Sequence, residues 1–246
     1  MNIQGKKILI TGANGGIGSA LIKALLACQA AKIYAAARDP QSLRESFAAE
    51  ADRVFPVQVD ITDSASVQQL AQDCGDIDIL INNAGVNRGR WFTATDALEA
   101  ARTEMEVNYF GTLNMCRAFV PFLVARKAGM IVNVSSIIGM VNMPVNGSYC
   151  ASKAAVHSLT QGLRGEMAPH GVTVIGVYPG PVETRMTEGL EMPKTSPDVV
   201  AKAIVDGMTE GKTTITPDPM SSQLYGFLLK DYESAEKELG AVLPGA

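Results

Sequence analysis

The chain opens with the stretch GKKILITGANGGIG, which spans residues 5–18. Residues 7–10 form a short apolar run typical of a buried strand, and apolar side chains recur at helical spacing after the turn. Between these two patterns lie Gly12, Gly16 and Gly18, which let the backbone approach a pyrophosphate. The N-terminus of the following helix supplies free N–H groups and partial positive charge. The stretch therefore predicts a strand, a glycine turn and a helix, the opening of a dinucleotide-binding unit, although the spacing is not the commoner GxGxxG.

Short apolar runs alternate with helical patterns along the rest of the chain. The strand-like runs lie at residues 7–10, 32–37, 54–59, 78–82, 130–135 and 172–178, with a shorter seventh run at 213–216. They show little apolar–polar alternation, as expected for strands covered on both faces. The pattern predicts the α/β class: a single doubly wound, Rossmann-type domain over residues 1–246, whose seven-stranded, mostly parallel sheet has helices on both faces.

The composition limits the partners that the chain can have. It has 246 residues, of which 47% are hydrophobic, and a formal net charge of −4. Neither this charge nor any cluster of basic residues favours nucleic acid or a membrane surface. The most apolar stretch, residues 107–125, contains Asn114 and Arg117, so we expect a buried helix rather than a membrane span. The first strand begins almost at the N-terminus, which leaves no room for a signal peptide and predicts a cytoplasmic protein.

The cysteines are scattered along the chain. They are Cys28, Cys74, Cys116 and Cys150. They form no CxxC pair and lack the spacing of a metal site, and a reducing compartment keeps such thiols free. We therefore expect structural or incidental thiols and no bound metal.

A tyrosine and a lysine, Tyr149 and Lys153, lie four residues apart, and Ser136 lies 13 residues before the tyrosine. On a helix, one turn would place the phenol and the ammonium on the same face. A nearby positive charge lowers the pKa of a phenol, which normally ionises near pH ~10, and such a phenol can transfer protons near neutral pH. The simpler alternative is a tyrosine and a lysine on the surface of an ordinary helix, and the remaining motifs argue against it.

Six motifs follow one another along nearly the whole chain. They are TGANGGIG at residues 11–18, NNAG at 82–85, NYFG at 108–111, VSS at 134–136, YCASK at 149–153 and PG at 179–180. In order and spacing they resemble the motifs of the classical short-chain dehydrogenase/reductase family, and none departs in a way that indicates a lost activity. The resemblance implies a Rossmann-type fold, a nicotinamide cofactor, and oxidoreduction between a carbonyl group and an alcohol.

The resemblance assigns the cofactor site to segments that follow the strands. Its members would be Thr11, Gly12, Asn14, Gly16, Ile17 and Gly18 in the glycine turn, Arg38 after the second strand, Asp60 and Ile61 after the third, Asn83, Ala84 and Gly85 after the fourth, Pro179, Gly180, Val182 and Thr184 after the sixth, and Tyr149 and Lys153. The Asp60 carboxylate and the next amide would hold the adenine, although an aspartate there can also cap a helix.

The end of the second strand indicates which nicotinamide is bound. The strand ends at Ala37, where NAD-dependent proteins usually carry an aspartate that bonds the ribose hydroxyls and repels a 2′-phosphate. Arg38 follows, and a guanidinium can pair with that phosphate. We therefore expect NADP (NADPH). NAD is the less favoured alternative, supported by Gly15, which stands where many NADP users carry a basic residue.

The resemblance also implies how the chemistry is shared. A nicotinamide transfers hydride, so carbonyl reduction needs a proton donor, and Tyr149 would be that acid, or the base in the reverse direction. Lys153 would lower the pKa of the phenol and hold the nicotinamide ribose. Ser136, the second of two adjacent serines, would polarise the carbonyl oxygen. Asn108, in a helix expected over residues 93–127, would bend that helix and anchor a water that links the lysine to solvent.

Three segments are expected to line the substrate pocket: residues 86–92, 137–147 and a loop at about 181–195. They contribute Trp91, Phe92, Ile137, Ile138, Met140, Val141, Met143, Val145, Met186 and Met192. This apolar, methionine-rich set indicates an uncharged, fairly hydrophobic ketone, aldehyde or secondary alcohol. Three arginines, Arg88, Arg90 and Arg185, leave open an acidic substituent, and the loop is expected to become ordered on binding.

Other functions are compatible with parts of the pattern. A nucleotide-sensing regulator would keep the fold without the chemistry, but the catalytic positions are intact. Sugar-nucleotide epimerases share Tyr-x-x-x-Lys but need a larger C-terminal region, and enoyl reduction fits the compact spacing less well. The helical tail, about residues 218–240, carries interleaved charges and is solvated, or forms a lid or a subunit contact. By resemblance we expect a homo-oligomer, a dimer or tetramer formed through the helices at 93–127 and 148–168.

Overall fold

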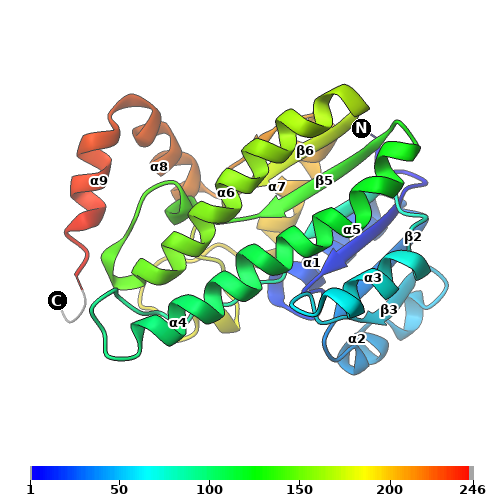
Figure 1. The fold of residues 1–246 in the computed structure, drawn as a ribbon, viewed down its shortest axis with the longest axis horizontal. Helices are drawn as coiled ribbons and strands as arrows, with labels where there is room; N and C mark the ends of the chain where they lie inside the picture. Colours follow the sequence, from blue (N-terminus) through cyan, green and yellow to red (C-terminus); the bar gives the residue numbers. More distant parts are fainter. Residues whose placement is uncertain (1, 244–246) are drawn as a thin grey trace.

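A seven-stranded sheet forms the centre of the molecule in the computed structural model, which describes residues 2–243 (Figure 1). The strands are β1 Lys7–Thr11, β2 Lys32–Ala37, β3 Val54–Gln58, β4 Ile79–Asn82, β5 Gly129–Val134, β6 Val172–Val177 and β7 Thr214–Ile215. Their order across the sheet is β3-β2-β1-β4-β5-β6-β7, and every neighbouring pair is parallel. The predicted α/β class and doubly wound Rossmann-type sheet are confirmed, and the sheet is entirely parallel.

Helices cover both faces of this sheet (Figure 1). They are α1 Gly16–Ala27, α2 Gln41–Ser46, α3 Ser64–Asp73, α4 Ala97–Glu104, α5 Gly111–Ala125, α6 Gly147–Met167, α7 Pro197–Glu210, α8 Pro219–Lys230 and α9 Tyr232–Gly240. Successive residues of a strand point to opposite faces, so β1 contributes to two cores. Ile8 and Ile10 belong to the core with α1 and α7, whereas Leu9 belongs to the core with α3, α5 and α6.

The strand order reverses between β1 and β4, and ligands of open parallel sheets bind at such a point, beyond the carboxyl ends of the strands. Two predicted motifs meet there. The Thr11 hydroxyl oxygen accepts hydrogen bonds from the backbone N–H groups of Asn83 and Ala84, at 3.0 and 3.1 Å. The Asn83 amide donates to the carbonyls of Thr11 and Gly12, at 3.0 and 3.1 Å. These bonds hold the glycine turn against the NNAG segment.

The helix expected over residues 93–127 has a break in its regular geometry. A π-helical segment, Met105–Phe110, joins α4 to α5 and contains Asn108. Segments of this kind are rare and occur frequently at functional sites. The hydroxyl of Thr112 donates to the carbonyl of Asn108 at 2.7 Å. A distortion is therefore present where the resemblance implied one.

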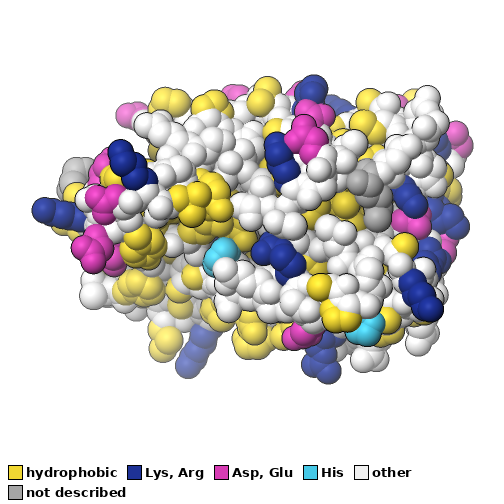
Figure 2. Space-filling model, turned by 90° about the horizontal axis from the view of Figure 1, so that it is seen from above, with side chains coloured by type: hydrophobic (Ala, Val, Ile, Leu, Met, Phe, Trp, Pro, Cys, Tyr) yellow, Lys and Arg dark blue, Asp and Glu magenta, His cyan; other side chains and the backbone are white. Residues whose placement is uncertain are grey.

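The tail of the chain forms two helices, α8 and α9, rather than the one helix that the pattern indicated. We call residues 219–240 the C-terminal arm, and it extends from one end of the sheet (Figure 1). The helices separate at Asp231, whose carboxylate accepts a hydrogen bond from the Ser234 N–H at 3.1 Å and caps α9. Basic and acidic side chains are interspersed at this end of the molecule (Figure 2). Within residues 2–243, no helix is both long enough and apolar enough to span a bilayer.

Candidate active site

The glycine turn leaves the start of α1 open to a ligand. The helix has Gly15 as its N-cap, with no side-chain cap and no acidic residue in its first turn. Gly12 has a φ of +62°, and a Cβ there would lie 2.8 Å from the Cα of Ala84. A Cβ on Gly18 would overlap the Gly12 carbonyl oxygen. Free N–H groups on a tight, side-chain-free turn suit a pyrophosphate, so this end of α1 fits the phosphates of a dinucleotide.

The loop after β6 reaches the same end of α1. A Cβ on Gly16 would lie 2.5 Å from the Thr184 methyl carbon, so the two residues are in close contact. The carbonyl of Pro179 accepts hydrogen bonds from the Ile137 N–H at 3.1 Å and from the Ser136 hydroxyl at 3.3 Å. The structure therefore brings the predicted phosphate end, the PG loop and the serine segment together.

Arg38 and Asp60 lie near each other at the far end of the predicted dinucleotide site. Hydrogen bonds from the backbone N–H and hydroxyl of Thr62, at 3.0 and 2.7 Å, lower the pKa of the Asp60 carboxyl, and the positive charge of Arg38 lowers it further. The cap of α3 is Asp63, so Asp60 is not the helix cap that the sequence left open. An exposed guanidinium beside an exposed carboxylate fits the adenosine end of a dinucleotide.

The first turns of α6 carry the predicted tyrosine and lysine. Tyr149 is 8% exposed and Lys153 is 4% exposed. The lysine Nζ lies 5.7 Å from the centroid of the phenol ring and donates a hydrogen bond to the carbonyl of Val134 at 3.0 Å. The Ser136 side chain hydrogen-bonds the phenol, whereas the hydroxyl of Ser135 donates to the Lys153 carbonyl at 2.8 Å. The two adjacent serines therefore have different partners, and Ser136 is the one beside Tyr149.

Burial controls the ionisation of this pair. It raises the pKa of Tyr149 above the usual range of a phenol, and the neighbouring Cys150 and Glu104 raise it further, while the hydrogen bond with Ser136 lowers it. Burial also lowers the pKa of Lys153 to about 8. The expectation of a lowered pKa for the phenol is wrong for this structure, because burial disfavours the phenolate and is the largest cause of the shift.

Asn108, in the NYFG motif, joins the segment after NNAG to the YCASK motif. Its side-chain oxygen accepts the Val86 N–H at 2.8 Å, and its amide donates to the Val86 carbonyl at 2.9 Å and to the Ser152 hydroxyl at 2.8 Å. A Cβ on Gly85 would lie 3.1 Å from the Asn108 oxygen and 3.3 Å from Nζ of Lys153. The asparagine therefore fixes the segment after NNAG next to the lysine.

Asp218, at the start of the C-terminal arm, belongs to none of the predicted motifs. It is 4% exposed, and its carboxylate accepts hydrogen bonds from the N–H of Gly180 and from the N–H and hydroxyl of Ser221, each at 2.8 Å. A Cβ on Gly180 would lie 2.9 Å from the carboxylate. Asp218 followed by Pro219 is a recognisable helix start, but nothing in the sequence pairs it with the PG loop.

A histidine–tyrosine pair makes a second unpredicted link to the PG loop. His157 lies one helical turn after Lys153, and its Nδ1 is 2.7 Å from the hydroxyl of Tyr178, which directly precedes Pro179. Burial raises the pKa of Tyr178 to about 12 and lowers the pKa of His157. The pair joins α6 to the end of β6, and no motif contains either residue.

The residues expected to line the substrate pocket differ in their exposure. Ile137 and Val141 are only 2% and 3% exposed, whereas Ile138, Met140, Met143 and Val145 are partly buried. The rim carries the exposed side chains of Trp91, Phe92, Met186 and Met192. Phe92 packs against the start of α6, since a Cβ on Gly147 would lie 2.9 Å from its ring.

The loop at 181–195 is closed at its base by backbone hydrogen bonds. The Glu183 N–H donates to the Thr195 carbonyl at 2.9 Å, and the Thr195 N–H donates to the Pro181 carbonyl at 3.0 Å. Among the three arginines that left open an acidic substrate, Arg90 is committed to Asp96 through an ion pair at 2.7 Å. Arg88 and Arg185 have exposed side chains, so an acidic substituent on the substrate stays open. The loop itself is anchored at both ends.

A parallel sheet with a glycine turn at its switch point, beside a buried serine, tyrosine and lysine, defines an oxidoreductase of the dinucleotide-binding class. The chain belongs to the short-chain dehydrogenase family, because the family model described as short chain dehydrogenase matches residues 6–194.

Solved structures and curated proteins agree with this membership. A short chain dehydrogenase from Burkholderia cenocepacia J2315, crystallised in complex with NADP, is 40% identical with a TM-score of 0.91 and covers 97% of this chain and 99% of that one. A short chain dehydrogenase/reductase from Burkholderia phymatum in complex with NAD shares the fold at 24% identity, a TM-score of 0.83 and coverage of 95% and 96%. The 3-oxoacyl-[acyl-carrier-protein] reductase of Thermotoga maritima is 36% identical over 204 residues, 77% of this chain and 79% of that protein.

Proposed function

We propose that the chain is an NADP(H)-dependent oxidoreductase that interconverts a hydrophobic ketone or aldehyde and the corresponding alcohol. The observation that carries this proposal is the meeting of Ser136, Tyr149 and Lys153 beside the glycine turn, at the carboxyl ends of the central strands. An uncapped helix start and an exposed arginine at opposite ends of the predicted cofactor site support it.

Each residue of this group has a distinct role in the proposal. NADPH, when bound, supplies the hydride. The raised pKa of Tyr149 keeps its proton in place at neutral pH, so the phenol donates it to the developing alkoxide. The Ser136 hydroxyl polarises the carbonyl oxygen, and the Lys153 ammonium holds the nicotinamide ribose. Asn108 holds Val86 in place, and a relay water at this asparagine stays a prediction.

The cofactor preference rests on the end of β2. Arg38 is exposed and forms no ion pair within residues 2–243, so its guanidinium is available to a 2′-phosphate. The Burkholderia cenocepacia relative binds NADP and the more distant Burkholderia phymatum protein binds NAD. A kinetic comparison of NADPH with NADH therefore decides which cofactor this chain prefers. The variant Arg38→Asp should raise the KM for NADPH at least tenfold and change the KM for NADH much less. Unchanged NADPH kinetics would remove Arg38 from the assignment.

The apolar rim supports a hydrophobic substrate. Trp91, Phe92, Met186 and Met192 present mainly hydrocarbon and thioether surface, which favours an uncharged carbonyl compound. The name of the Thermotoga maritima reductase describes reduction of an oxo group in an acyl chain, which supports carbonyl chemistry for this chain as well. A panel of aliphatic, aromatic and acidic ketones assayed with both nicotinamides tests the class.

Replacement of the phenol tests the chemistry. Tyr149→Phe should lower kcat by about 10²–10⁴-fold, the range expected for a lost general acid, while NADPH binding stays nearly intact. Tyr232→Phe, on the exposed surface of α9, is the matched control and should retain full activity. Activity of Tyr149→Phe close to that of the parent would remove the tyrosine from the mechanism. NADPH binding without turnover of any carbonyl by the parent chain would favour the sensing alternative.

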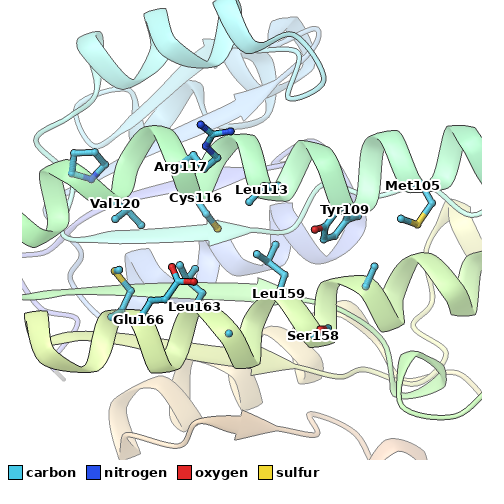
Figure 3. Close-up of a pocket in the computed structure, with 14 residues that line it drawn as sticks. Met105, Tyr109, Leu113, Cys116, Arg117, Val120, Ser158, Leu159, Leu163 and Glu166 are labelled. Atoms are coloured by element: carbon cyan, nitrogen blue, oxygen red, sulfur yellow. The ribbon is translucent and has the colours of Figure 1, made fainter.

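A groove of about 730 Å³ between α5 and α6, away from Tyr149, supports the expected homo-oligomer (Figure 3). Its walls include Leu113 and Val120 on α5 and Leu159 and Leu163 on α6 (Figure 3). Arg117 on one wall and Glu166 on the other add opposite charges. In an interface between two-fold related copies, one residue of a surface contacts a different residue of the same surface on the other copy. Apolar walls with an arginine on one side and a glutamate on the other therefore suit a second copy of the chain.

A charge placed in the groove tests this assembly. Leu159→Arg should convert a dimer or tetramer to monomers on a sizing column, because an unpaired charge would be buried at the interface. Leu229→Arg on the arm, where the side chain is 71% exposed, is the matched control and should leave the size unchanged. A monomeric parent chain at micromolar concentration would contradict the proposal.

The cytoplasm is the location that we propose for the protein. Within residues 2–243, the four cysteines are free thiols. A reducing compartment keeps such thiols unpaired. Fractionation of cells that produce the chain would test this location.

A further inference from the structure

Glu104, the last residue of α4, is a buried carboxyl group without a positive partner. Its side chain is fully buried, and Oε1 accepts a hydrogen bond from the backbone N–H of Arg88 at 2.6 Å. Oε2 has no hydrogen-bond partner among residues 2–243, and the ion pairs found in that part of the chain do not include Glu104. Burial of a carboxylate with so few partners is unfavourable for stability, so the residue calls for an explanation other than packing.

Glu104 lies between the two sides of the proposed active site. Arg88 belongs to the segment of residues 86–92, which leads from the NNAG motif to the apolar rim. On the other side, Glu104 interacts electrostatically with Tyr149 and Cys150 at the start of α6, and α4 packs against α6.

The same helical face continues to Asn108, one turn later, which bonds Val86. Glu104 and Asn108 thus hold the segment at two points that lie two residues apart. Because the Arg88 N–H is a backbone group, this contact positions the main chain of the segment and leaves the arginine side chain exposed.

We propose that Glu104 is a positioning residue for the reaction, which fastens the substrate-side segment at Arg88 and places a buried carboxyl group beside the start of α6, where Tyr149 lies. The proposal rests on the function proposed above. A carboxylate near a phenol disfavours the phenolate, so Tyr149 keeps its proton to a higher pH and can donate it to the developing alkoxide.

The other charged and titratable groups near Tyr149 come from α6 and from the segment 86–92. On α6, Cys150 also raises the pKa of Tyr149, and the Lys153 Nζ lies 5.7 Å from the centroid of the phenol ring. In the segment 86–92, Arg90 is paired with Asp96. The arginine at position 88 has an exposed side chain.

The variant Glu104→Gln separates charge from shape. Glutamine keeps the oxygen that accepts the Arg88 N–H, and it replaces the other oxygen by a neutral amide of the same size. The alkaline limb of the pH–kcat profile for carbonyl reduction should move to lower pH by about one unit, while the KM for the carbonyl compound changes less than about threefold. The alkaline limb should move to lower pH whether it reports the ionisation of Tyr149 or that of Lys153, because the loss of a nearby negative charge lowers the pKa of either group.

Two further variants complete the comparison. Glu104→Asp keeps the charge but shortens the side chain, so it should leave the limb in place and raise the KM at least fivefold through the lost contact with Arg88. Glu106→Gln removes an exposed charge two residues away and should change neither quantity. A Glu104→Gln profile that coincides with that of the parent would overturn the assigned charge, and an unchanged KM in Glu104→Asp would overturn the fastening role.

A titration without substrate separates this proposal from the function on which it rests. The ultraviolet absorbance of tyrosinate, followed against pH in the parent and in Tyr149→Phe, isolates the ionisation of Tyr149. The same difference measured in the Glu104→Gln background should move to lower pH, even if no tested carbonyl is reduced. An unmoved titration would overturn the proposal independently of activity, and a moved titration without turnover would mean that only the proposed function has failed.

Discussion

The strongest test of how the C-terminal arm supports the cofactor site is the substitution Asp218→Ala. The carboxylate accepts three hydrogen bonds of 2.8 Å, one from the Gly180 N–H and two from Ser221, and it is 4% exposed. Its loss would leave the Gly180 N–H without its acceptor and α8 without its cap. Because one end of the interaction is in the PG loop, stability and cofactor affinity should fall together.

The magnitude follows from these contacts. A hydrogen bond to a charged group contributes about 1.5–3 kcal/mol and a helix cap about 1 kcal/mol, but the bonds share one acceptor and water partly replaces them. We therefore expect the free energy of unfolding to fall by about 3 kcal/mol. For a chain of this size this corresponds to a decrease in Tm of about 10 °C. Displacement of the PG loop should raise the Kd for NADPH about tenfold, which is about 1.4 kcal/mol.

Urea denaturation and NADPH fluorescence titration measure the two effects. Asp218→Asn, which keeps one oxygen acceptor, should give intermediate values of both. Asp231→Ala removes the cap of α9 at an exposed site, so it should cost less stability and leave NADPH binding unchanged. The reasoning is refuted if Asp218→Ala behaves like Asp231→Ala, or if it loses stability with no change in cofactor affinity.

Three further outcomes are expected. Turnover in carbonyl reduction should fall as the pH rises through about 8, because burial lowers the pKa of Lys153 to about 8 and the ammonium is lost above that pH. A kcat that stays constant up to pH ~10 would contradict this prediction. Gly12→Ala should lower the free energy of unfolding by about 2 kcal/mol or more and weaken NADPH binding, because the positive φ and the nearby backbone both exclude a Cβ. Gly5→Ala is the control: φ is also positive, but the space is open, so less stability should be lost. Equal losses in thermal unfolding would disprove the steric argument. Ser136→Ala should lower kcat about 10²-fold with little change in Tm. Ser135→Ala should mainly lower Tm, because it loses the hydrogen bond to the carbonyl of Lys153. The reverse pattern in kinetics and calorimetry would exchange the roles assigned to the two serines.

Local patterns were sufficient to predict the fold class and much of the candidate site. The glycine turn at 12–18 needs residues without Cβ atoms, and the apolar strand runs need cover on both faces, so their chemistry is visible in the sequence. Tyr149 and Lys153 are one turn apart on any helix, so their proximity also follows from spacing alone. The break at Asn108 was expected only through resemblance, because nothing in its neighbours dictates a π-helical segment.

Other features depend on contacts between distant segments. The pKa of the tyrosine moved in the direction opposite to expectation, because burial depends on everything packed around α6. The tail was expected to be one helix, although the capping chemistry of Asp231 was present in the sequence. The deep burial of Ile137 and Val141 and the exposure of Trp91 and Phe92 also depend on the fold, because the sequence of a loop does not show which of its apolar residues are covered.

By itself, the sequence determined the strand–turn–helix opening, the alternation of strands and helices, and the set of residues proposed to bind a dinucleotide and move a proton. The tertiary structure alone decided that Asp218 holds the Gly180 N–H, that His157 meets Tyr178, and that Glu104 is buried between Arg88 and the start of α6. The physical reason is that periodicity and motif spacing report contacts within one element. Burial and long-range hydrogen bonds arise only when elements far apart in the chain pack together.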